Sequence, residues 1–206
     1  MSKHLFIVRH AESQANSNNL TSDELTELSS IGVQQAESLA NNDLFKDLQI
    51  IYVSPLKRSK QTGEVIAGRH GHLSIVENEL IKEKKDPSSF SLLKRDELPW
   101  DDIKKHRMDP DWKIEDGESF NDVKKRVRLT LEMVEQSSEE NILLVSHASF
   151  IKHLALFVIL GDEFTPANFY KFGDRMETKN TGITTFKHKQ KYYETSPSWY
   201  LMSWMS

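Results

Sequence analysis

The sequence contains no cysteine, which excludes disulfide bonds, thiolate metal sites and every mechanism that uses a cysteine nucleophile. It has no apolar run close to the roughly 20 residues that span a membrane. Its start, MSKHLFIVRH, lacks the long apolar stretch of a signal peptide. The net charge of −4 provides no basic excess for nucleic acid. These absences predict a cytoplasmic protein that binds neither a membrane nor nucleic acid.

The composition is that of a globular protein, with 37% hydrophobic residues among 206 and charges of both signs. Short apolar runs at 4–8, 50–53 and 142–145 predict buried strands, and helical periodicity follows at 31–42, 57–68, 118–136 and 149–160. This alternation predicts an α/β fold whose mostly parallel central sheet is flanked by helices on both faces. From Thr181 onward, weak alternation predicts one or two edge strands.

A charged stretch at about 82–112 contains Pro87, Pro99 and Pro110, which break it into short helices. We expect this stretch to be a small helical insertion over the active site of a single domain that spans residues 1–206. The substrate specificity would then depend on this insertion and on the polar loop Ser13–Ser30.

Polar and basic residues follow each main predicted strand. Arg9 and His10 end the first strand, Arg58 follows shortly after the second, and His147 ends the third. Because ligands of open α/β sheets bind beyond the carboxyl ends of the strands, these four side chains should converge. Arginine forks bind phosphate oxygens and stay charged, and the start of the helix after His147 would add N–H donors. The pattern therefore predicts a phosphate site.

One of these histidines can also be a nucleophile. A neutral imidazole nitrogen attacks phosphorus and forms a phosphohistidine, which water then hydrolyses. This chemistry requires no metal and no other cofactor.

Three stretches carry a resemblance to a known family. VRHAESQAN, SPLKRSKQT and VSHASFIKHL are similar to the three motifs of the histidine phosphatase superfamily, also called the phosphoglycerate mutase-like family. Ala11 and Ala148 stand where that family has glycine. The likeness extends from residue 4 to about 186, and it implies the α/β fold described above.

The resemblance also implies residue roles. His10 would be the nucleophile, and Arg9, Arg58 and His147 would hold the phosphate. Asn16 would help to bind it. The family's proton donor is a carboxylate after the third strand, and Glu83 is the best match to it.

Glu79 is the second candidate for the proton donor, because the Trp-Glu-Gly portion that follows the donor in the family is missing here. The resemblance implies a metal-independent phosphomonoester hydrolase that acts on a small phosphorylated substrate. A phosphoglycerate mutase-type phosphotransferase and a catalytically weak phosphate- or partner-binding module are the alternatives. The physiological substrate and the oligomeric state stay open.

Overall fold

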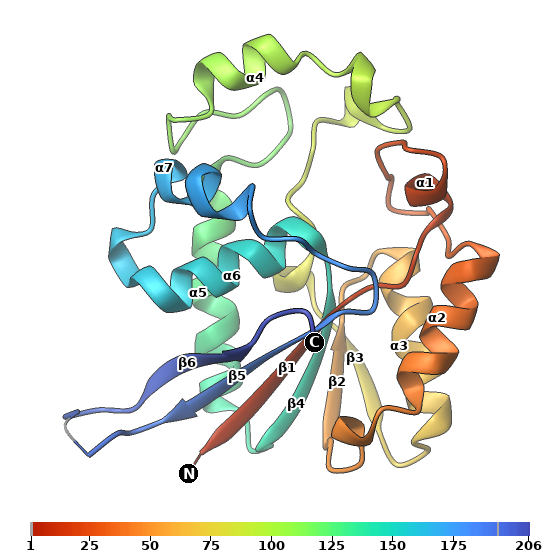
Figure 1. Ribbon diagram of the computed structural model, residues 1–206, viewed down its shortest axis with the longest axis vertical. Coiled ribbons are helices and arrows are strands. Elements are labelled where there is room, and N and C mark those ends of the chain that lie inside the picture. Colours follow the sequence, from red (N-terminus) through yellow and green to blue (C-terminus); the bar gives the residue numbers. More distant parts are fainter. Residues whose placement is uncertain (1, 193) are drawn as a thin grey trace.

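A computed structural model describes residues 2–192 and 194–206 and contains a six-stranded sheet in the order β3-β2-β4-β1-β5-β6 (Figure 1). The strands are β1 (Lys3–Arg9), β2 (Ile50–Val53), β3 (Ser74–Glu77), β4 (Asn141–Ser146), β5 (Ile183–Lys189) and β6 (Ser198–Ser203). The first four strands run parallel, whereas β5 and β6 are antiparallel to their neighbours. The predicted α/β fold with a mostly parallel sheet is confirmed.

Helices cover both faces of this sheet, as predicted (Figure 1). The α-helices are α1 (Gln14–Ser17), α2 (Ser30–Ala40), α3 (Lys57–Arg69), α4 (Trp100–His106), α5 (Phe120–Gln136), α6 (Ala148–Leu160) and α7 (Pro166–Asn168). The short turns of other helix types are η1 (Asp43–Phe45), η2 (Glu79–Ile81), η3 (Ser88–Phe90), η4 (Arg95–Glu97), η5 (Gly161–Glu163) and the π-helical η6 (Phe169–Gly173). Helices α2 and α3 lie on one side of the sheet, and α5 and α6 lie on the other.

The alternation of side chains along β1 explains why both faces are covered. Leu5 and Ile7 belong to the core beneath α5 and α6, whereas Phe6 and Val8 belong to the core beneath α2 and α3. Successive side chains of a strand point to opposite faces, so a continuous apolar run needs a helical layer on each side. β1 and β4 therefore lie in the interior of the sheet.

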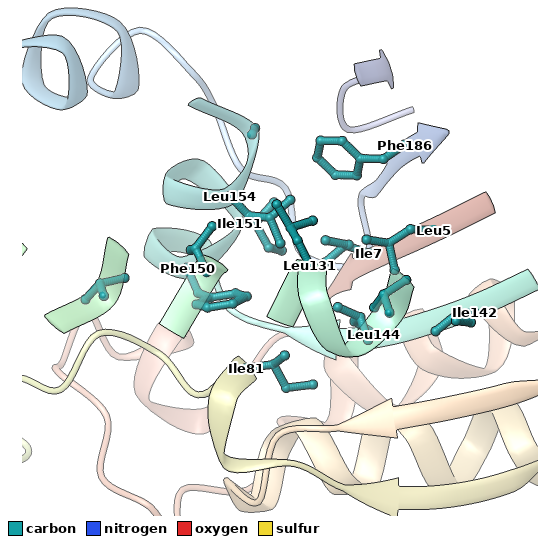
Figure 2. Close-up of a cluster of buried hydrophobic side chains, with 14 of the residues drawn as sticks. Leu5, Ile7, Ile81, Leu131, Ile142, Leu144, Phe150, Ile151, Leu154 and Phe186 are labelled. Carbon is teal, nitrogen blue, oxygen red and sulfur yellow. The ribbon is translucent and has the colours of Figure 1, made fainter. Parts of the chain in front are cut away.

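Figure 2 shows the core on the α5–α6 side. Leu131 of α5 and Leu154 of α6 pack towards Leu5 and Ile7 of β1, and Phe186 of β5 closes one end of the cluster. Full burial of a leucine or isoleucine side chain contributes about 1.5–3 kcal/mol. This packing fixes the carboxyl ends of β1 and β4, where the predicted site residues begin.

Residues 82–112 arch over those strand ends at the top of the molecule (Figure 1). The prolines act as expected, since Pro87 directly precedes η3 and Pro99 directly precedes α4. Proline is tolerated there because the first N–H groups of a helix lack intrahelical partners. That this stretch is an insertion in a single domain stays a prediction.

The C-terminal tail departs from the prediction of edge strands alone. β5 lies inside the sheet, paired with β1 on one side and β6 on the other, and only β6 is an edge. The reason is that Ile183 and Phe186 bury their side chains in the two cores. The polar segment at 13–30 also contains α1, a single turn capped by Ser13 and too short to show helical periodicity.

Candidate active site

His10 follows β1 directly and is almost fully buried. Its backbone N–H donates to the carbonyl of Ser146 at 2.9 Å, and the side-chain amide of Asn180 donates to its carbonyl at 2.9 Å. Its Nδ1 lies 2.7 Å from the carbonyl oxygen of Ala11. Because a carbonyl can only accept, we assign the proton to Nδ1, which leaves a lone pair on Nε2. Alanine in place of glycine keeps this contact.

Arg58, in the first turn of α3, faces that lone pair. Its Nε donates to Nε2 of His10 at 3.2 Å, and its Nη1 donates to the carbonyl of Asp23 at 2.8 Å. Thr62, one turn further along α3, accepts the N–H of Ala11 at 3.1 Å. Helix α3 therefore positions both Arg58 and the backbone of Ala11, which directly follows His10.

Gly63 brings α3 close to the sheet. A Cβ atom at this position would lie 2.4 Å from Cγ1 of Val53, a separation that real side chains do not tolerate. Only glycine permits the helix to approach β2 this closely, and the approach places Arg58 beneath the strand ends.

His147 and Arg9 complete the group. The two histidine rings lie 5.0 Å apart, and Nε2 of His147 shares a hydrogen bond of 2.8 Å with Oγ of Ser54. Arg9 donates from Nη1 to the carbonyl of Thr178. Nδ1 of His147 and Nε of Arg9 are buried and find no partner within the described residues. Buried polar atoms are almost always hydrogen-bonded, so each of these two nitrogens is suited to an anionic ligand. Arg9 lines the cavity described below, whereas His147 is fully buried and is not among the residues that line it.

Burial controls the charge of these side chains. It is the main cause that lowers the pKa of His10 and of His147 well below the usual histidine value, and Arg58 lowers both further. Burial also lowers the pKa of Arg58 to about 10, against the opposing attraction of Glu83. At neutral pH the site therefore combines neutral imidazoles with charged guanidinium groups.

The carboxylate of Glu83 lies at the N-terminus of α6 and accepts backbone N–H groups that we expected to bind the phosphate. Its carboxylate accepts the N–H groups of Ser149 and Phe150, each at 3.1 Å, and that of Lys84 at 2.9 Å. The expectation that the start of α6 would offer its N–H groups to the phosphate is therefore wrong for those of Ser149 and Phe150. They are bound because a carboxylate is itself favoured at a helix N-terminus.

Glu79, the alternative donor, has a different environment. Its side chain is 76% exposed and forms an ion pair with Lys82 at 3.4 Å. Glu83 lines the same cavity as His10, whereas Glu79 is not among the residues that line it. The geometry favours Glu83 as the acid.

This cavity has a volume of about 760 Å³. Its floor contains Arg9, His10 and Arg58, and Asn16 lines it from α1, where its Oδ1 accepts the N–H of Ser13 at 3.2 Å. The other residues that line it come from several parts of the chain, which are 21–24, Leu56, 82–88, 90–91, Arg95, the first turns of α6 including Lys152, and the region of η6 including Asp174.

Several residues that hold the site were not identified from the sequence. Ser54, Thr178 and Asn180 position His147, Arg9 and His10 through the contacts given above. The signal that could have found Asn180 is the stretch NTGIT, which also resembles the family. The described residues contain no group of three side chains suited to hold a metal ion. None of their helices has the length and apolar character that a membrane crossing requires.

Comparison with known proteins agrees with this geometry. The sequence pattern of the histidine phosphatase superfamily (branch 1) matches residues 5–196. A protein of Hydrogenobacter thermophilus, provisionally named phosphoserine phosphatase 2, is 30% identical over 168 residues, which are 77% of this chain and 79% of that protein. The 5''-phosphoribostamycin phosphatase of Niallia circulans is 32% identical over 173 residues, which are 77% of this chain and 80% of that protein.

A solved structure has the same fold. The crystal structure of a mutant phosphoserine phosphatase from Entamoeba histolytica, in complex with phosphoserine, is 27% identical and has a TM-score of 0.78. The match covers 99% of this chain and 97% of that chain.

Proposed function

Because the chain belongs to the histidine phosphatase superfamily (branch 1), it is a phosphatase, and we propose that it hydrolyses a small phosphomonoester through a phosphohistidine on His10. One observation carries the assignment of His10. Its Nε2 accepts the N–H of Arg58, and His10, Arg58 and Arg9 line the same cavity. This is the arrangement that a nucleophile beneath a bound phosphate requires.

In the first step, Nε2 of His10 attacks phosphorus while the bond from phosphorus to the ester oxygen breaks. Arg9, Arg58 and His147 donate hydrogen bonds to the non-bridging oxygens, and Asn16 adds its side-chain amide. Because the charge in this transition state is spread over those oxygens, fixed cationic donors contribute most of the catalysis. The imidazole becomes positive as it is phosphorylated, and the Ala11 carbonyl at Nδ1–H stabilises that charge.

Glu83 supplies the proton that the leaving oxygen needs. Each carboxyl oxygen has two lone pairs. Within the described residues, Oε1 accepts two N–H groups and Oε2 accepts one, which leaves one position on Oε2 for a proton. After the alcohol leaves, the carboxylate accepts a proton from water, which attacks the phosphohistidine and releases phosphate.

The relatives support a small organic phosphomonoester as the substrate, since the names of two of them specify phosphoserine and 5''-phosphoribostamycin. A cavity of about 760 Å³ has room for an alcohol portion larger than the phosphate itself. The reaction would need no metal or other cofactor. A cytoplasmic location and the lack of nucleic-acid partners remain predictions from the sequence.

The test is a hydrolysis assay with para-nitrophenyl phosphate and a panel of phosphorylated metabolites. We expect the wild-type protein to release phosphate and the His10→Ala variant to lose this activity. His188→Ala is the matched control, because His188 lies in β5 and does not line the cavity. Hydrolysis by the His10→Ala variant at the wild-type rate would contradict the proposal.

A further inference from the structure

Glu83 is carried by a stretch of chain, residues 83–87, that belongs to no helix or strand. The backbone N–H and C=O groups of such a stretch have no regular ladder of hydrogen bonds, so side chains from elsewhere have to bind those that are shielded from water. An acid catalyst has to lie within hydrogen-bond reach of the leaving oxygen. The groups that bind this backbone therefore also set the position of the acid.

The guanidinium group of Arg126, on α5, binds this backbone directly. Its Nη1 donates to the carbonyl oxygens of Leu80 at 2.6 Å and Lys82 at 3.0 Å, and its Nη2 donates to that of Glu83 at 3.3 Å. The side chain of Arg126 is only 15% exposed. Arginine suits this place because it stays charged when it is shielded from water and presents several donors in a rigid fork. One side chain thus fixes the backbone up to the carbonyl of Glu83.

Glu118, just before α5, binds the same guanidinium and the backbone on the other side of Glu83. Its Oε1 accepts Nε of Arg126 and its Oε2 accepts Nη2, each at 2.7 Å. Its Oε2 also accepts the backbone N–H of Lys85 at 2.8 Å, and its own backbone N–H donates to the carbonyl of Lys85 at 2.9 Å. This two-pronged ion pair therefore connects α5 to the backbone before and after Glu83.

The carboxylate of Glu83 is held from a second direction, by the N–H groups of Ser149 and Phe150 described above. The guanidinium carbon of Arg126 lies 5.3 Å from the centre of the Phe150 ring. Arg126 thus contacts both the backbone that carries Glu83 and a residue that binds its carboxylate. In such an arrangement a displacement of about 1 Å is enough to slow a reaction by about 10²-fold.

We propose that the ion pair of Arg126 and Glu118 positions Glu83 to protonate the leaving oxygen. The proposal rests on the function proposed above, in which Glu83 is the acid, and it adds two positioning residues. Neither of them lines the cavity above His10. Loss of either should therefore impair proton transfer to the leaving group and spare the phosphate site.

The experiment compares kcat/KM for para-nitrophenyl phosphate and phenyl phosphate. The two esters have similar shapes, but phenolate is the poorer leaving group and depends more on the proton. We expect Arg126→Met to raise the ratio of kcat/KM, para-nitrophenyl phosphate over phenyl phosphate, by about tenfold, which is a part of the roughly 10²–10⁴-fold that a general acid contributes. Glu118→Gln is a milder change and should raise the same ratio by less, because the amide keeps one of the two accepting oxygens.

The double variant of Arg126→Met with Glu83→Gln distinguishes positioning from a general loss of structure. Once the acid is gone, Arg126→Met should raise the ratio no further. Arg128→Met is the matched control, because Arg128 lies on the same helix, is half exposed and pairs with Asp162 instead of the backbone near Glu83. It should keep the wild-type ratio. The ratio of two substrates on one variant does not depend on how much of that variant is folded.

Each other outcome has a distinct meaning. A ratio that Glu83→Gln raises and Arg126→Met leaves unchanged would overturn the proposal while the acid role of Glu83 stands. A further rise in the double variant would overturn it too, since Arg126 would then act through another group. An unchanged ratio in Glu83→Gln would refute the acid role, and the positioning role with it. Absence of hydrolysis of both esters by the wild-type protein would instead refute the proposed function.

Discussion

Nε of Arg58 donates to Nε2 of His10 at 3.2 Å, so a guanidinium group holds the imidazole of the proposed nucleophile. An imidazolium would place a proton where Arg58 already donates one, and therefore this contact selects the neutral ring. When a phosphate enters, the same guanidinium can turn its N–H groups to the phosphate oxygens and release the lone pair for attack. The two residues thus combine protection of the nucleophile with binding of the substrate.

Removal of Arg58 should therefore reduce activity strongly. We expect Arg58→Ala to lower kcat/KM by about 10²–10³-fold, since a fixed donor to the transition-state charge is lost. Arg58→Lys should recover only part of this loss, because lysine keeps the charge without the two-pronged geometry. Inhibition by vanadate should weaken in parallel. Arg69→Ala, an exposed position at the end of the same helix, should resemble wild type in both measurements.

Glu83→Gln should give a defect that depends on the leaving group. Transfer from a sugar phosphate should slow by about 10²–10⁴-fold, because its alkoxide needs a proton. Para-nitrophenyl phosphate should slow much less, since its leaving group is already stable. Glu79→Gln is the matched control and should affect neither substrate. Equal slowing of both substrates in Glu83→Gln would show that this residue does not donate the proton.

The stability of the fold should fall as the solution becomes acidic. Burial lowers the pKa of His153 to about 3 from 6.5. Between these two pH values the unfolded chain therefore binds a proton on His153 that the folded chain does not bind. The stabilisation is complete above pH 6.5 and is lost progressively as the pH falls from 6.5 towards 3. Burial of His10 and His147 acts in the same direction. Each histidine contributes about 1.4 kcal/mol per pH unit inside its own window.

Urea unfolding at several pH values between 8 and 5 measures this effect. His153→Gln should reduce the slope of the unfolding free energy against pH by about the contribution of one histidine. The same slope in His153→Gln as in wild type would contradict the assignment of a strongly lowered pKa.

Activity should survive excess EDTA. The positive charge at the phosphate comes from Arg9 and Arg58, and the described residues offer no group of three metal-ligating side chains. Loss of hydrolysis in the chelator, with recovery on addition of magnesium or zinc, would show that the mechanism depends on a metal.

The sequence predicted the parts of the fold that have strong local signals. Continuous apolar runs identified β1 and β4, and the residues that end these strands identified Arg9, His10 and His147. The convergence of these residues with Arg58 followed from the general geometry of parallel sheets. The predicted strands and the proximity of these side chains agree with the structure because each depends on a periodicity or on a strand end, and the catalytic roles of the residues stay predictions.

Other features depend on contacts between distant segments, which no local pattern reveals. Asn180 reaches the carbonyl of His10 across 170 positions of the chain. The interior position of β5 depends on which neighbours bury Phe186, and its weak alternation resembled that of an edge strand. The N–H groups at the start of α6 looked available for phosphate, because nothing in the local sequence indicated that Glu83 would bind them.

The central claim is that phosphate is transferred to His10. Mixing of the protein with labelled substrate, followed by a rapid alkaline quench and mass spectrometry of peptides, measures this directly, since phosphohistidine survives base and breaks down in acid. We predict label on the peptide that contains His10, stable in base and lost in acid, and no label in His10→Ala. Labelled phosphate that persists in His10→Ala, or turnover by the wild-type protein without any trapped label, would contradict the account.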